Sequence, residues 1–363
     1  MRKDVVIIGA GPAGLSAAIE IAKLAPGKVL VIDENKSPGG QLFKQIHKFF
    51  GSKAHDAGVR GIDIGKKMLA DAEKLGVEIW LNSAVIGLFP DKKVAVLKDG
   101  TTLTVDAGRV LVCTGASENA ISFPGWTLPG VMGAGAAQTM TNVSRVLPGQ
   151  RILMIGSGNV GVIVSYQLVQ AGAEVVGIVE AMPRIGAYGV HASKVRRAGV
   201  PFYLGHTIMR AGGEGRVEQA VIVAIDEHFR PIPGTEKQLD VDVICLAAGL
   251  RPMTELAWMR GVEHAYIPEL GGWMPLHNGD MESSVPGIYV AGDTAGVEEA
   301  NTAIDEGRLA GVAIAQSLGL LASEEAEAQK KEIRDRLTAL RQGPFGERRL
   351  SAKHRIIEGG MNA

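Results

Sequence analysis

The stretch Gly9-Ala-Gly11-Pro-Ala-Gly14, close to the start of the sequence, constrains the fold most strongly. An apolar run at residues 5–8 is typical of a strand buried on both faces, and a helix-like run follows at residues 15–24. In the order strand, glycine turn and helix, Gly9 makes a tight turn, Gly11 lets the backbone approach a pyrophosphate, and Gly14 lets the helix pack on the strand. The helix start adds unpaired N–H groups and a partial positive charge. The stretch therefore predicts a dinucleotide-binding βαβ unit.

An acidic residue ends the next expected strand. Pro26-Gly27 stops the first helix, an apolar strand follows at residues 28–32, and Asp33 lies at its end, 19 residues after Gly14. A carboxylate at this place can accept the hydroxyl groups of an adenosine ribose. The alternative is an ordinary βαβ unit with a glycine-containing turn.

The same pattern returns in the middle of the chain. A predicted strand at residues 151–155 leads into Gly156-Ser-Gly158-Asn-Val-Gly161, and a predicted helix follows at residues 162–171. Glu180 ends the next strand, 19 residues after Gly161, which repeats the spacing of the first unit. The two units share the same order of elements and the same spacing from glycine to acid. Together they argue against a chance match far more strongly than either unit does alone.

Composition excludes several classes of protein. A chain of 363 residues suggests two or three domains, and a net charge of −1 gives no basic excess for nucleic acid or an anionic membrane. Cys113 and Cys245 are the two cysteines, so a disulfide framework, a zinc site and an iron–sulfur cluster held by this chain alone are not expected. No signal-peptide pattern or membrane-spanning apolar run stands in the sequence, which predicts a soluble cytoplasmic protein.

Hydrophobic periodicity and turn residues predict the other elements. The expected helices are 64–75 with Asp63 as its cap, 133–146, 192–198 and 299–318. The expected β segments are 77–81, 84–89, 94–98, 101–105, 109–113, 174–179, 202–204, 217–226, 241–247 and 287–291, with a hairpin turn at Asp99-Gly100.

Two polar regions have less definite patterns. Residues 42–60 contain Lys44, His47 and His55 and form either a loop over a cofactor or a solvated connector, and for these three side chains a surface or connector role is favoured. The tail has helical spacing up to Leu340. Beyond it, a basic stretch with Arg348, Arg349, Lys353 and Arg355 predicts a solvated helix with a frayed end rather than a docking element.

Taken in order, these pieces resemble the two-dinucleotide flavoproteins, which include thioredoxin reductase and NADH-dependent ferredoxin reductases. The resemblance covers about residues 4–320. It implies an α/β fold with two Rossmann-like three-layer domains, in which an NAD domain is inserted in a split FAD domain. The implied parts are 1–118 and 268–322 for FAD, 119–267 for NAD(H) with its connectors, and a charged tail at 323–363.

The resemblance also implies the cofactor contacts. For Asn301 and Thr302, at the start of the last helix, the alternative is an ordinary role in its first turn. The implied FAD contacts are Gly9, Gly11, Pro12, Ala13, Gly14, Asp33, Glu34, Gly40, Gln41, Thr114, Gly115, Gly292, Asp293, Asn301 and Thr302. The implied NAD contacts are Gly156, Gly158, Asn159, Val160, Gly161, Glu180 and Gly249.

Glu180 favours NADH over NADPH, because a carboxylate accepts ribose hydroxyls but repels a 2′-phosphate. Arg184, four residues on, could relieve that repulsion. Hydride transfer between the implied cofactors needs no nucleophile or general base, so no catalytic side chain and no metal site are predicted. Both cysteines are expected to be small buried residues of strands.

A narrower resemblance lies in Phe123-Pro-Gly-Trp-Thr-Leu-Pro-Gly-Val-Met-Gly-Ala-Gly-Ala-Ala-Gln138. It is similar to the FAD/NADH-binding subunits of multi-subunit amine oxidoreductases, which include sarcosine oxidase, opine oxidase, hydrogen cyanide synthase and proline or hydroxyproline dehydrogenase. The Cys-x-x-Cys of thioredoxin reductases is absent, which excludes dithiol chemistry. The cysteine-rich [2Fe–2S] domain of many amine oxidoreductase subunits is absent too, so any cluster is expected in a partner chain.

The expected function is electron transfer between NAD(H) and FAD in one subunit of an oligomeric amine or imino-acid dehydrogenase or oxidase. The implied partners are a small [2Fe–2S] protein and a second flavoprotein subunit. One alternative is a stand-alone NADH-dependent reductase of a ferredoxin, a quinone or a small molecule. Another is a flavin-binding assembly subunit with a nonfunctional nicotinamide site.

Overall fold

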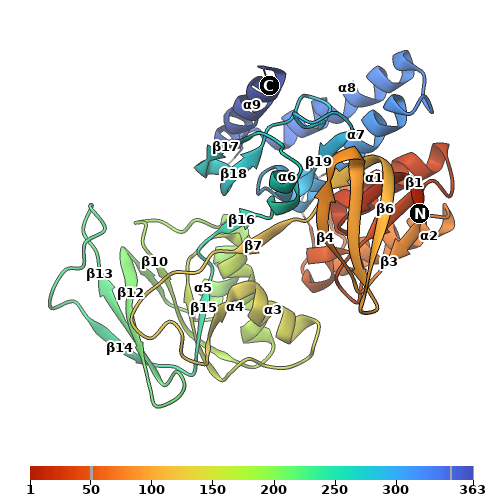
Figure 1. The fold of residues 1–363 in the computed structure, drawn as a ribbon. Helices are drawn as coiled ribbons and strands as arrows, with labels where there is room; N and C mark the ends of the chain where they lie inside the picture. The colour runs from red at the N-terminus through yellow and green to blue at the C-terminus, as the bar shows by residue number, and fades with distance from the viewer. Residues whose placement is uncertain (50–51, 344–345, 363) are drawn as a thin grey trace. The chain divides into compact units, whose positions relative to one another are not determined.

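The computed structural model describes residues 1–49, 52–343 and 346–362, so Phe50 and Gly51 of the segment 42–60 lie outside the described residues. The chain forms two compact units (Figure 1). It leaves the first unit after Ser117 and returns to it at Arg251. Residues 251–267, which the sequence assigns to the inserted domain, therefore cluster with the first unit.

The first unit is built on a mixed sheet in the order β3-β2-β1-β6-β5-β4, to which β19 adds by pairing with β6. Residues 5–8 of β1 are buried, as a central parallel strand requires. The strands are β1 (Arg2–Ile8), β2 (Val29–Ile32), β3 (Glu78–Trp80), β4 (Ser83–Phe89), β5 (Lys93–Lys98), β6 (Thr101–Val112) and β19 (Ile288–Val290).

Strand β6 corrects the predicted break between 101–105 and 109–113. Its first half pairs antiparallel with β5, and its second half pairs parallel with β1. The chain stays extended through Gly108, where a Cβ atom would lie 2.6 Å from the Asp4 carbonyl oxygen. Glycine thus allows the close approach that keeps the two halves in one strand.

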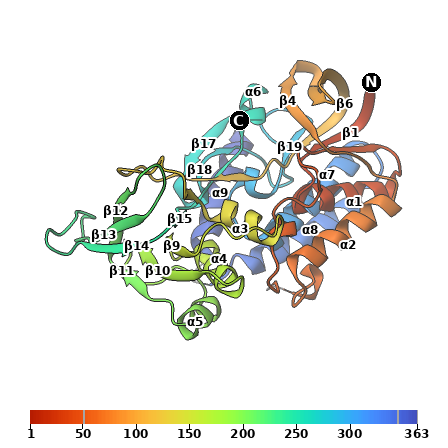
Figure 2. The same cartoon turned by 90° about the horizontal axis from the view of Figure 1, so that it is seen from below.

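Helices α1, α2, α7 and α8 lie side by side in this unit (Figure 2). Helix α2 has Arg60 as its N-cap, so the prediction that Asp63 caps it was wrong, and Asp63 lies in the first turn instead. The helices of the unit are α1 (Pro12–Leu24), α2 (Gly61–Lys74), α6 (Glu255–Met259), α7 (Ala300–Ser317), α8 (Ser323–Leu340) and α9 (Glu347–Asn362). Its other elements are η1 (Gly40–Lys44), η2 (Lys53–His55), η3 (Pro90–Lys92), η4 (Pro268–Leu270), η5 (Gly292–Ala295), β17 (His264–Ile267) and β18 (Gly272–Pro275).

The tail is not the solvated, frayed end that its composition predicts. Helix α8 confirms the helical spacing up to Leu340, but α9 packs Ala352 and Ile356 against Leu270 and Met274. Lys353 of α9 is 1% exposed. The basic stretch is therefore a docked helix, in which Ala352 and Ile356 lie four residues apart on the buried face.

The second unit, residues 118–250, has a five-stranded parallel sheet in the order β11-β10-β9-β15-β8 and a separate antiparallel sheet, β12-β13-β14. Strand β12 was not predicted, because its sequence mixes polar and apolar residues without clear alternation. The strands are β8 (Val131–Gly133), β9 (Arg151–Ile155), β10 (Glu174–Glu180), β11 (Phe202–Leu204), β12 (His206–Gly212), β13 (Gln219–Ala224), β14 (Lys237–Asp240) and β15 (Val243–Leu246). The helices are α3 (Ala134–Asn142), α4 (Asn159–Gln170) and α5 (Gly189–Arg197). Where the chain passes between the units, β7 (Ala116–Glu118) pairs with β16 (Leu250–Pro252).

Within the described ranges, the structure contains no helix of the length and apolarity needed to cross a membrane.

Helices α1 and α7 approach each other through glycines. A Cβ atom on Gly307 would lie 2.1 Å from the Ala13 carbonyl oxygen, and one on Gly311 would lie 2.9 Å from that of Ala17. The two glycines are four residues apart and so share one face of α7. Because these two positions have no side chains, α1 can pack closely against that face of α7.

We expect Gly307→Ala to lower the free energy of unfolding by at least about 1–3 kcal/mol, because the added methyl group must push α1 and α7 apart. The matched control is Gly189→Ala at the first residue of α5, where a Cβ atom meets no described atom within 4 Å. The measurement is thermal unfolding of both variants beside the wild type. Equal midpoints for the two variants would contradict the close packing.

Candidate functional site

In the first glycine turn, two of the three glycines are required by the fold. Gly9 has a φ of 106°, and a Cβ atom on it would lie 2.3 Å from the Cys113 carbonyl oxygen. A Cβ atom on Gly14 would lie 2.0 Å from the Gly9 carbonyl oxygen. No side chain fits at either position, as the fingerprint predicts.

The second glycine turn has the same geometry. Gly156 has a φ of 104°, and its Cβ atom would lie 2.4 Å from the Ala247 carbonyl oxygen. A Cβ atom on Gly161 would lie 2.2 Å from the Gly156 carbonyl oxygen. The sequence repeat is therefore a structural repeat.

The middle glycine of each turn is different. Gly11 has a φ of −77° and Gly158 a φ of −65°, which any residue can adopt. Apart from each glycine and its neighbours in the chain, no atom of the described residues lies within 4 Å of a Cβ built at either position. Each is the N-cap of its helix and makes no side-chain capping bond. The fold therefore gives no reason for glycine here, whereas a group that approaches the backbone at the helix start would give one.

Asp33 at the end of β2 is held by three donors. Its Oδ2 accepts a hydrogen bond from the Ala10 N–H at 2.7 Å, and its Oδ1 accepts from the backbone N–H and the side-chain Nδ2 of Asn35, both at 2.8 Å. A carboxylate offers about four lone-pair sites, so capacity remains for a ligand hydroxyl. Asp33 is thus buried and oriented toward the glycine turn.

Glu180 at the end of β10 repeats this arrangement. Its Oε2 accepts from the Ser157 backbone N–H at 2.9 Å and from the Ser157 hydroxyl at 2.7 Å, and its Oε1 accepts from the Met182 N–H at 2.9 Å. In each unit, one donor is the residue directly after the first glycine, and another is the residue two positions after the acid. These donors were not predicted, although their equal spacing in the two units was a usable signal.

After each acid, the chain returns to the middle glycine. A Cβ atom on Gly40 would lie 3.1 Å from the Cα atom of Gly11, and one on Gly186 would lie 3.6 Å from that of Gly158. Glu34 and Gln41 are exposed, as is Val160. Residues 34–41 therefore lie along the first turn, with the polar side chains of Glu34 and Gln41 exposed.

In the second unit, two other predicted residues serve the fold. Asn159 accepts a hydrogen bond from the Tyr188 N–H through Oδ1 at 3.0 Å. Gly249 has a φ of 94°, and its carbonyl oxygen accepts from the Asn119 N–H at 3.0 Å. Both contacts fix loops beside the glycine turn.

The remaining residues predicted in the first unit meet at the carboxyl ends of β6 and β19. Thr114 donates through Oγ1 to the Met253 carbonyl oxygen at 2.6 Å, and the Gly115 N–H donates to Thr294 Oγ1 at 2.8 Å. Gly292 has a φ of 69°, and its Cβ atom would lie 2.9 Å from the Ala13 Cβ atom. Residues distant in sequence are thus brought to the start of α1, near Pro12 and Ala13.

Asp293 and the start of α7 complete this region. Burial raises the pKa of Asp293 to about 7, and its Oδ1 accepts from the Glu298 N–H at 3.4 Å. Asn301 accepts from the Thr302 N–H at 3.0 Å, and the Thr302 hydroxyl donates to the Glu299 carbonyl oxygen at 2.6 Å. The side chains of Asn301 and Thr302 therefore make the ordinary first-turn contacts of their helix.

Behind the turn lies a buried group of charges that the sequence did not predict, the Glu306 cluster (Glu298, Glu306, Arg341 and Lys353). Glu306 Oε1 accepts from Arg341 at 2.5 Å and from Lys353 at 2.7 Å, and Arg341 also pairs with Glu298 at 2.7 Å. Burial opposes ionisation of Glu306, but the two cations hold its pKa below the ordinary value. Burial, aided by Lys353, lowers the pKa of the neighbouring His277 to about 4.

A second buried charge group contains His55. Its Nε2 lies 2.8 Å from Asp305 Oδ2, and its Nδ1 lies 2.9 Å from Ser52 Oγ. Arg336 donates to both oxygens of Asp305, at 3.0 and 3.1 Å. Although burial raises the pKa of Asp305, His55 and the arginines lower it overall. Ser52, His55 and Asp305 connect η2 to α7, and Arg336 connects the same carboxylate to α8. Because Arg336 occupies this carboxylate, the three residues serve the structure.

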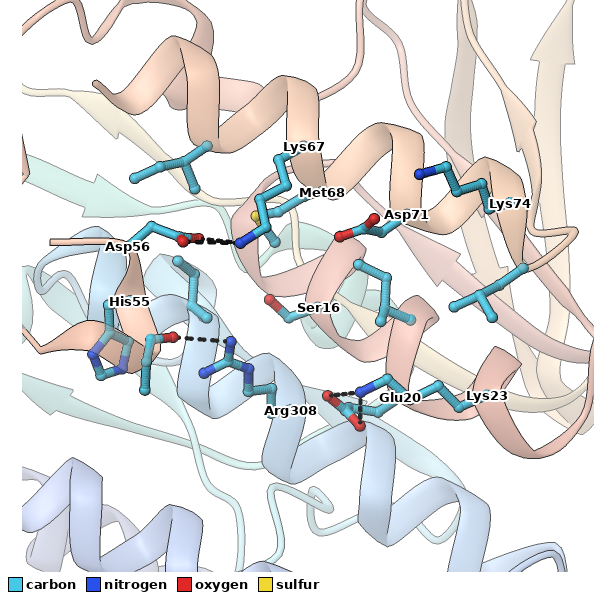
Figure 3. Close-up of a pocket in the computed structure, with 15 residues that line it drawn as sticks. Ser16, Glu20, Lys23, His55, Asp56, Lys67, Met68, Asp71, Lys74 and Arg308 are labelled. Carbon is cyan, nitrogen blue, oxygen red and sulfur yellow. Dashed lines mark hydrogen bonds and ion pairs between the residues drawn. The ribbon is translucent and has the colours of Figure 1, made fainter. Parts of the chain in front are cut away.

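The first unit also contains a cavity of about 400 Å³ among α1, α2, α7 and η2 (Figure 3). Two ion pairs join four of its charged side chains. Lys67 binds Asp56 at 2.8 Å, and Lys23 binds Glu20 at 2.9 Å. None of the predicted site residues lines this cavity.

Both cysteines are buried in separate units. Burial raises the pKa of the Cys113 thiol well above its usual range and that of Cys245 to about 12. Within the described parts of the chain, no cluster of three or more His, Cys, Asp or Glu side chains is arranged to hold a metal ion.

Fold and site together define an α/β protein with two repeated dinucleotide-type turns. The chain belongs to the pyridine nucleotide-disulphide oxidoreductase family, whose model matches residues 3–307, and it is an oxidoreductase of that family. The resemblance inferred from the sequence is thereby confirmed.

Similar proteins include subunits of hydrogen cyanide synthase, opine oxidase and sarcosine oxidase. The HcnB subunit of hydrogen cyanide synthase from Pseudomonas aeruginosa is 29% identical and matches 96% of this chain and 78% of its own. The A-type subunit of opine oxidase from Rhizobium meliloti is 32% identical and matches 87% and 71%. The alpha subunit of sarcosine oxidase from Rhizobium meliloti is 30% identical over 87% of this chain but only 31% of its own.

Solved structures support the fold. Thioredoxin reductase of T. acidophilum has a TM-score of 0.72 at 21% identity and covers 87% of this chain and 99% of its own. L-proline dehydrogenase from P. horikoshii has a TM-score of 0.69 at 22% identity and covers 92% and 59%. The predicted α/β class with parallel sheets is confirmed.

Asp293 makes the stability of the cofactor-free protein depend on pH. Its pKa is about 7 in the fold and 3.8 ordinarily, so the folded state holds a proton that the unfolded state has lost, and stability falls as pH rises from about 4 to 7. Asp293→Asn cannot ionise. We expect its melting temperature, relative to wild type, to rise between pH 4 and pH 7 and to level off above pH 7.

Asp305→Asn is the matched control. The pKa of Asp305 is lowered, so its stabilising charge is already present above the ordinary value of 3.8. Its deficit should stay constant from pH 5 to 8 and shrink only in stronger acid. Parallel pH profiles for the two variants would contradict the assigned shifts.

Proposed function

We propose that this chain is an FAD- and NAD(H)-dependent oxidoreductase, in which the first unit binds FAD and the second binds NAD(H). One observation carries the proposal. Gly11 and Gly158 have ordinary φ angles and open space where a side chain would lie, so the fold alone does not explain glycine at either position. A pyrophosphate resting on the helix start explains both.

The residues that meet at the start of α1 fit FAD. The backbone of Gly11 and the N–H groups of α1 would face the pyrophosphate, and the remaining capacity of Asp33 suits a ribose hydroxyl. Asp293 would lie along the rest of the cofactor. The proposed FAD contacts are Gly9, Gly11, Pro12, Ala13, Gly14, Asp33, Glu34, Gly40, Gln41, Thr114, Gly115, Gly292, Asp293, Asn301 and Thr302.

The second unit fits NADH better than NADPH. Three donors fix the Glu180 carboxylate beside the glycine turn, where a 2′-phosphate would meet a negative charge. Arg184 is exposed on the loop beyond. The proposed NAD contacts are Gly156, Gly158, Asn159, Val160, Gly161, Glu180 and Gly249.

When bound, the two cofactors supply the redox chemistry, in which a hydride passes between nicotinamide and flavin. The chain's own residues bind and orient them, and no side-chain nucleophile or base is needed. Cys113 and Cys245 lie in separate units and are buried with raised pKa values, so a dithiol relay between them has no support.

We further propose that the chain is an electron-transfer subunit of an amine or imino-acid dehydrogenase or oxidase. Its curated relatives are named as subunits of opine oxidase, sarcosine oxidase and hydrogen cyanide synthase. The stretch 123–138 is shared by resemblance with such subunits. Its Gly125 and Gly130 have positive φ and would clash with the carbonyl oxygens of Ala211 and Asp242 if they carried a Cβ atom, so the fold accounts for them. The proposed partners are a small [2Fe–2S] protein and a second flavoprotein subunit.

Substitutions at the two middle glycines test FAD binding and NADH binding separately. Gly11→Ala should keep the fold but weaken FAD binding at least about tenfold, because the methyl group occupies the space for the pyrophosphate. Gly158→Ala should retain FAD, but NADH should reduce this FAD, and so bleach its absorbance, far less than in the wild type. The measurements are flavin absorbance per chain and anaerobic stopped-flow reduction, with NADH compared with NADPH.

Gly14→Ala is the structural control, since its Cβ atom would lie 2.0 Å from the Gly9 carbonyl oxygen and should disrupt the first unit itself. Normal FAD content in Gly11→Ala would contradict the FAD assignment. Normal NADH reduction in Gly158→Ala would show that the second turn does not bind the reductant. Faster reduction by NADPH would reverse the proposed preference.

The subunit proposal predicts stable partners. Affinity purification of the chain from its native source should bring down a second flavoprotein in fixed stoichiometry, and the complex should oxidise an amine or imino acid. A chain that always purifies alone and reduces a ferredoxin, quinone or small molecule with NADH would favour the stand-alone alternative.

A further inference from the structure

The C-terminal helix contacts the turn that carries Asp293. Lys353 of α9 donates through Nζ to the Ala295 carbonyl oxygen at 2.9 Å, and its Cε atom lies 3.3 Å from the place of a Cβ atom on Gly296. Lys353 also donates to Glu306, whose other oxygen accepts from the Gly292 N–H at 3.0 Å. Both ends of the turn 292–296 are therefore fastened to one buried ion pair.

The charges make this attachment strong. Lys353 is 1% exposed and Glu306 is 2% exposed, and burying either charge without its partner is costly. Glu306 is shared with Arg341, which in turn is bound to Glu298. Charge-assisted hydrogen bonds are shorter and stronger than neutral ones, so they fix the turn more firmly than backbone contacts alone.

The position of α9 does not depend on Lys353 alone. Ala352 and Ile356 are fully buried against the hairpin β17–β18 and η4. On the surface of the same helix, Arg355 is half-exposed and pairs with Glu269 at 2.8 Å. A change at Lys353 should therefore release the turn while the helix stays docked.

We propose that Lys353 is a positioning residue for FAD. It acts from the C-terminal helix by holding the turn 292–296, and with it Asp293, in the conformation that receives the cofactor. This inference rests on the proposed FAD site of the first unit. It assigns to the charged tail a role in cofactor binding that its sequence does not reveal.

The test compares Lys353→Met with Arg355→Met, which removes a cation of the same helix from the surface. Apoprotein of each variant is titrated with FAD, and amide hydrogen exchange is followed in the turn 292–296 without cofactor. For Lys353→Met we expect FAD affinity to fall at least about tenfold, with faster exchange at Gly292. Arg355→Met should match the wild type in both measurements.

A double variant, Lys353→Met with Glu306→Gln, guards against misfolding, because it leaves no unpaired charge of this pair buried. It should fold, with Arg341 still bound to Glu298, and should show the same weak FAD binding. Unchanged FAD affinity and exchange in a folded Lys353 variant would overturn the inference while leaving the FAD site intact. If the wild type itself bound no FAD, the proposed function would fail, and the exchange data alone would still judge whether Lys353 holds the turn.

Discussion

The close approach of α1 to β1 is the constraint on which the first unit depends. Without a side chain at Gly14, the first turn of α1 lies directly against the Gly9 carbonyl oxygen. This places Ala13 where its carbonyl oxygen contacts Gly307 of α7 and its methyl group contacts Gly292. One absent side chain therefore sets the positions of the first glycine turn, the turn 292–296 and helix α7. Segments separated by the whole second unit meet there because glycine leaves room on both sides.

The sequence predicted those features that follow from local periodicity and from glycine. Both turns were predicted with their acids, because the spacing between Gly14 and Asp33 recurs between Gly161 and Glu180 and each acid ends an apolar strand. It did not predict that β6 is continuous through Gly108, since a glycine between two apolar runs is typical of a turn. The reason it is not a turn lies in Asp4, on a neighbouring strand, and such contacts leave no mark on the local pattern.

The buried charges could not be predicted for the same reason. Lys353 stands in a stretch of Arg and Lys that is typical of a solvated tail, and the sequence around Glu306 gives no sign that this carboxylate is buried. Each is costly to bury alone, and only their proximity in the fold removes that cost. His55 is a further example. Its sequence context favoured a surface or connector role, but the side chain is 2% exposed and its Nε2 lies 2.8 Å from Asp305 Oδ2, so the surface role was wrong.

Each unit holds its acidic side chain beside a glycine turn, but the donors differ between the units. This difference bears on the choice between NADH and NADPH. Asp33 reaches a backbone N–H at Ala10, whereas Glu180 binds both the N–H and the hydroxyl of Ser157, and that hydroxyl accepts from the Gly186 N–H at 3.0 Å. Glu180 is therefore linked through Ser157 to the loop that covers Gly158. A carboxylate held in this way cannot swing aside to admit a 2′-phosphate without breaking the contacts that shape the loop. Discrimination against NADPH, in the proposed function, would thus follow from the rigidity of Glu180 as much as from its charge.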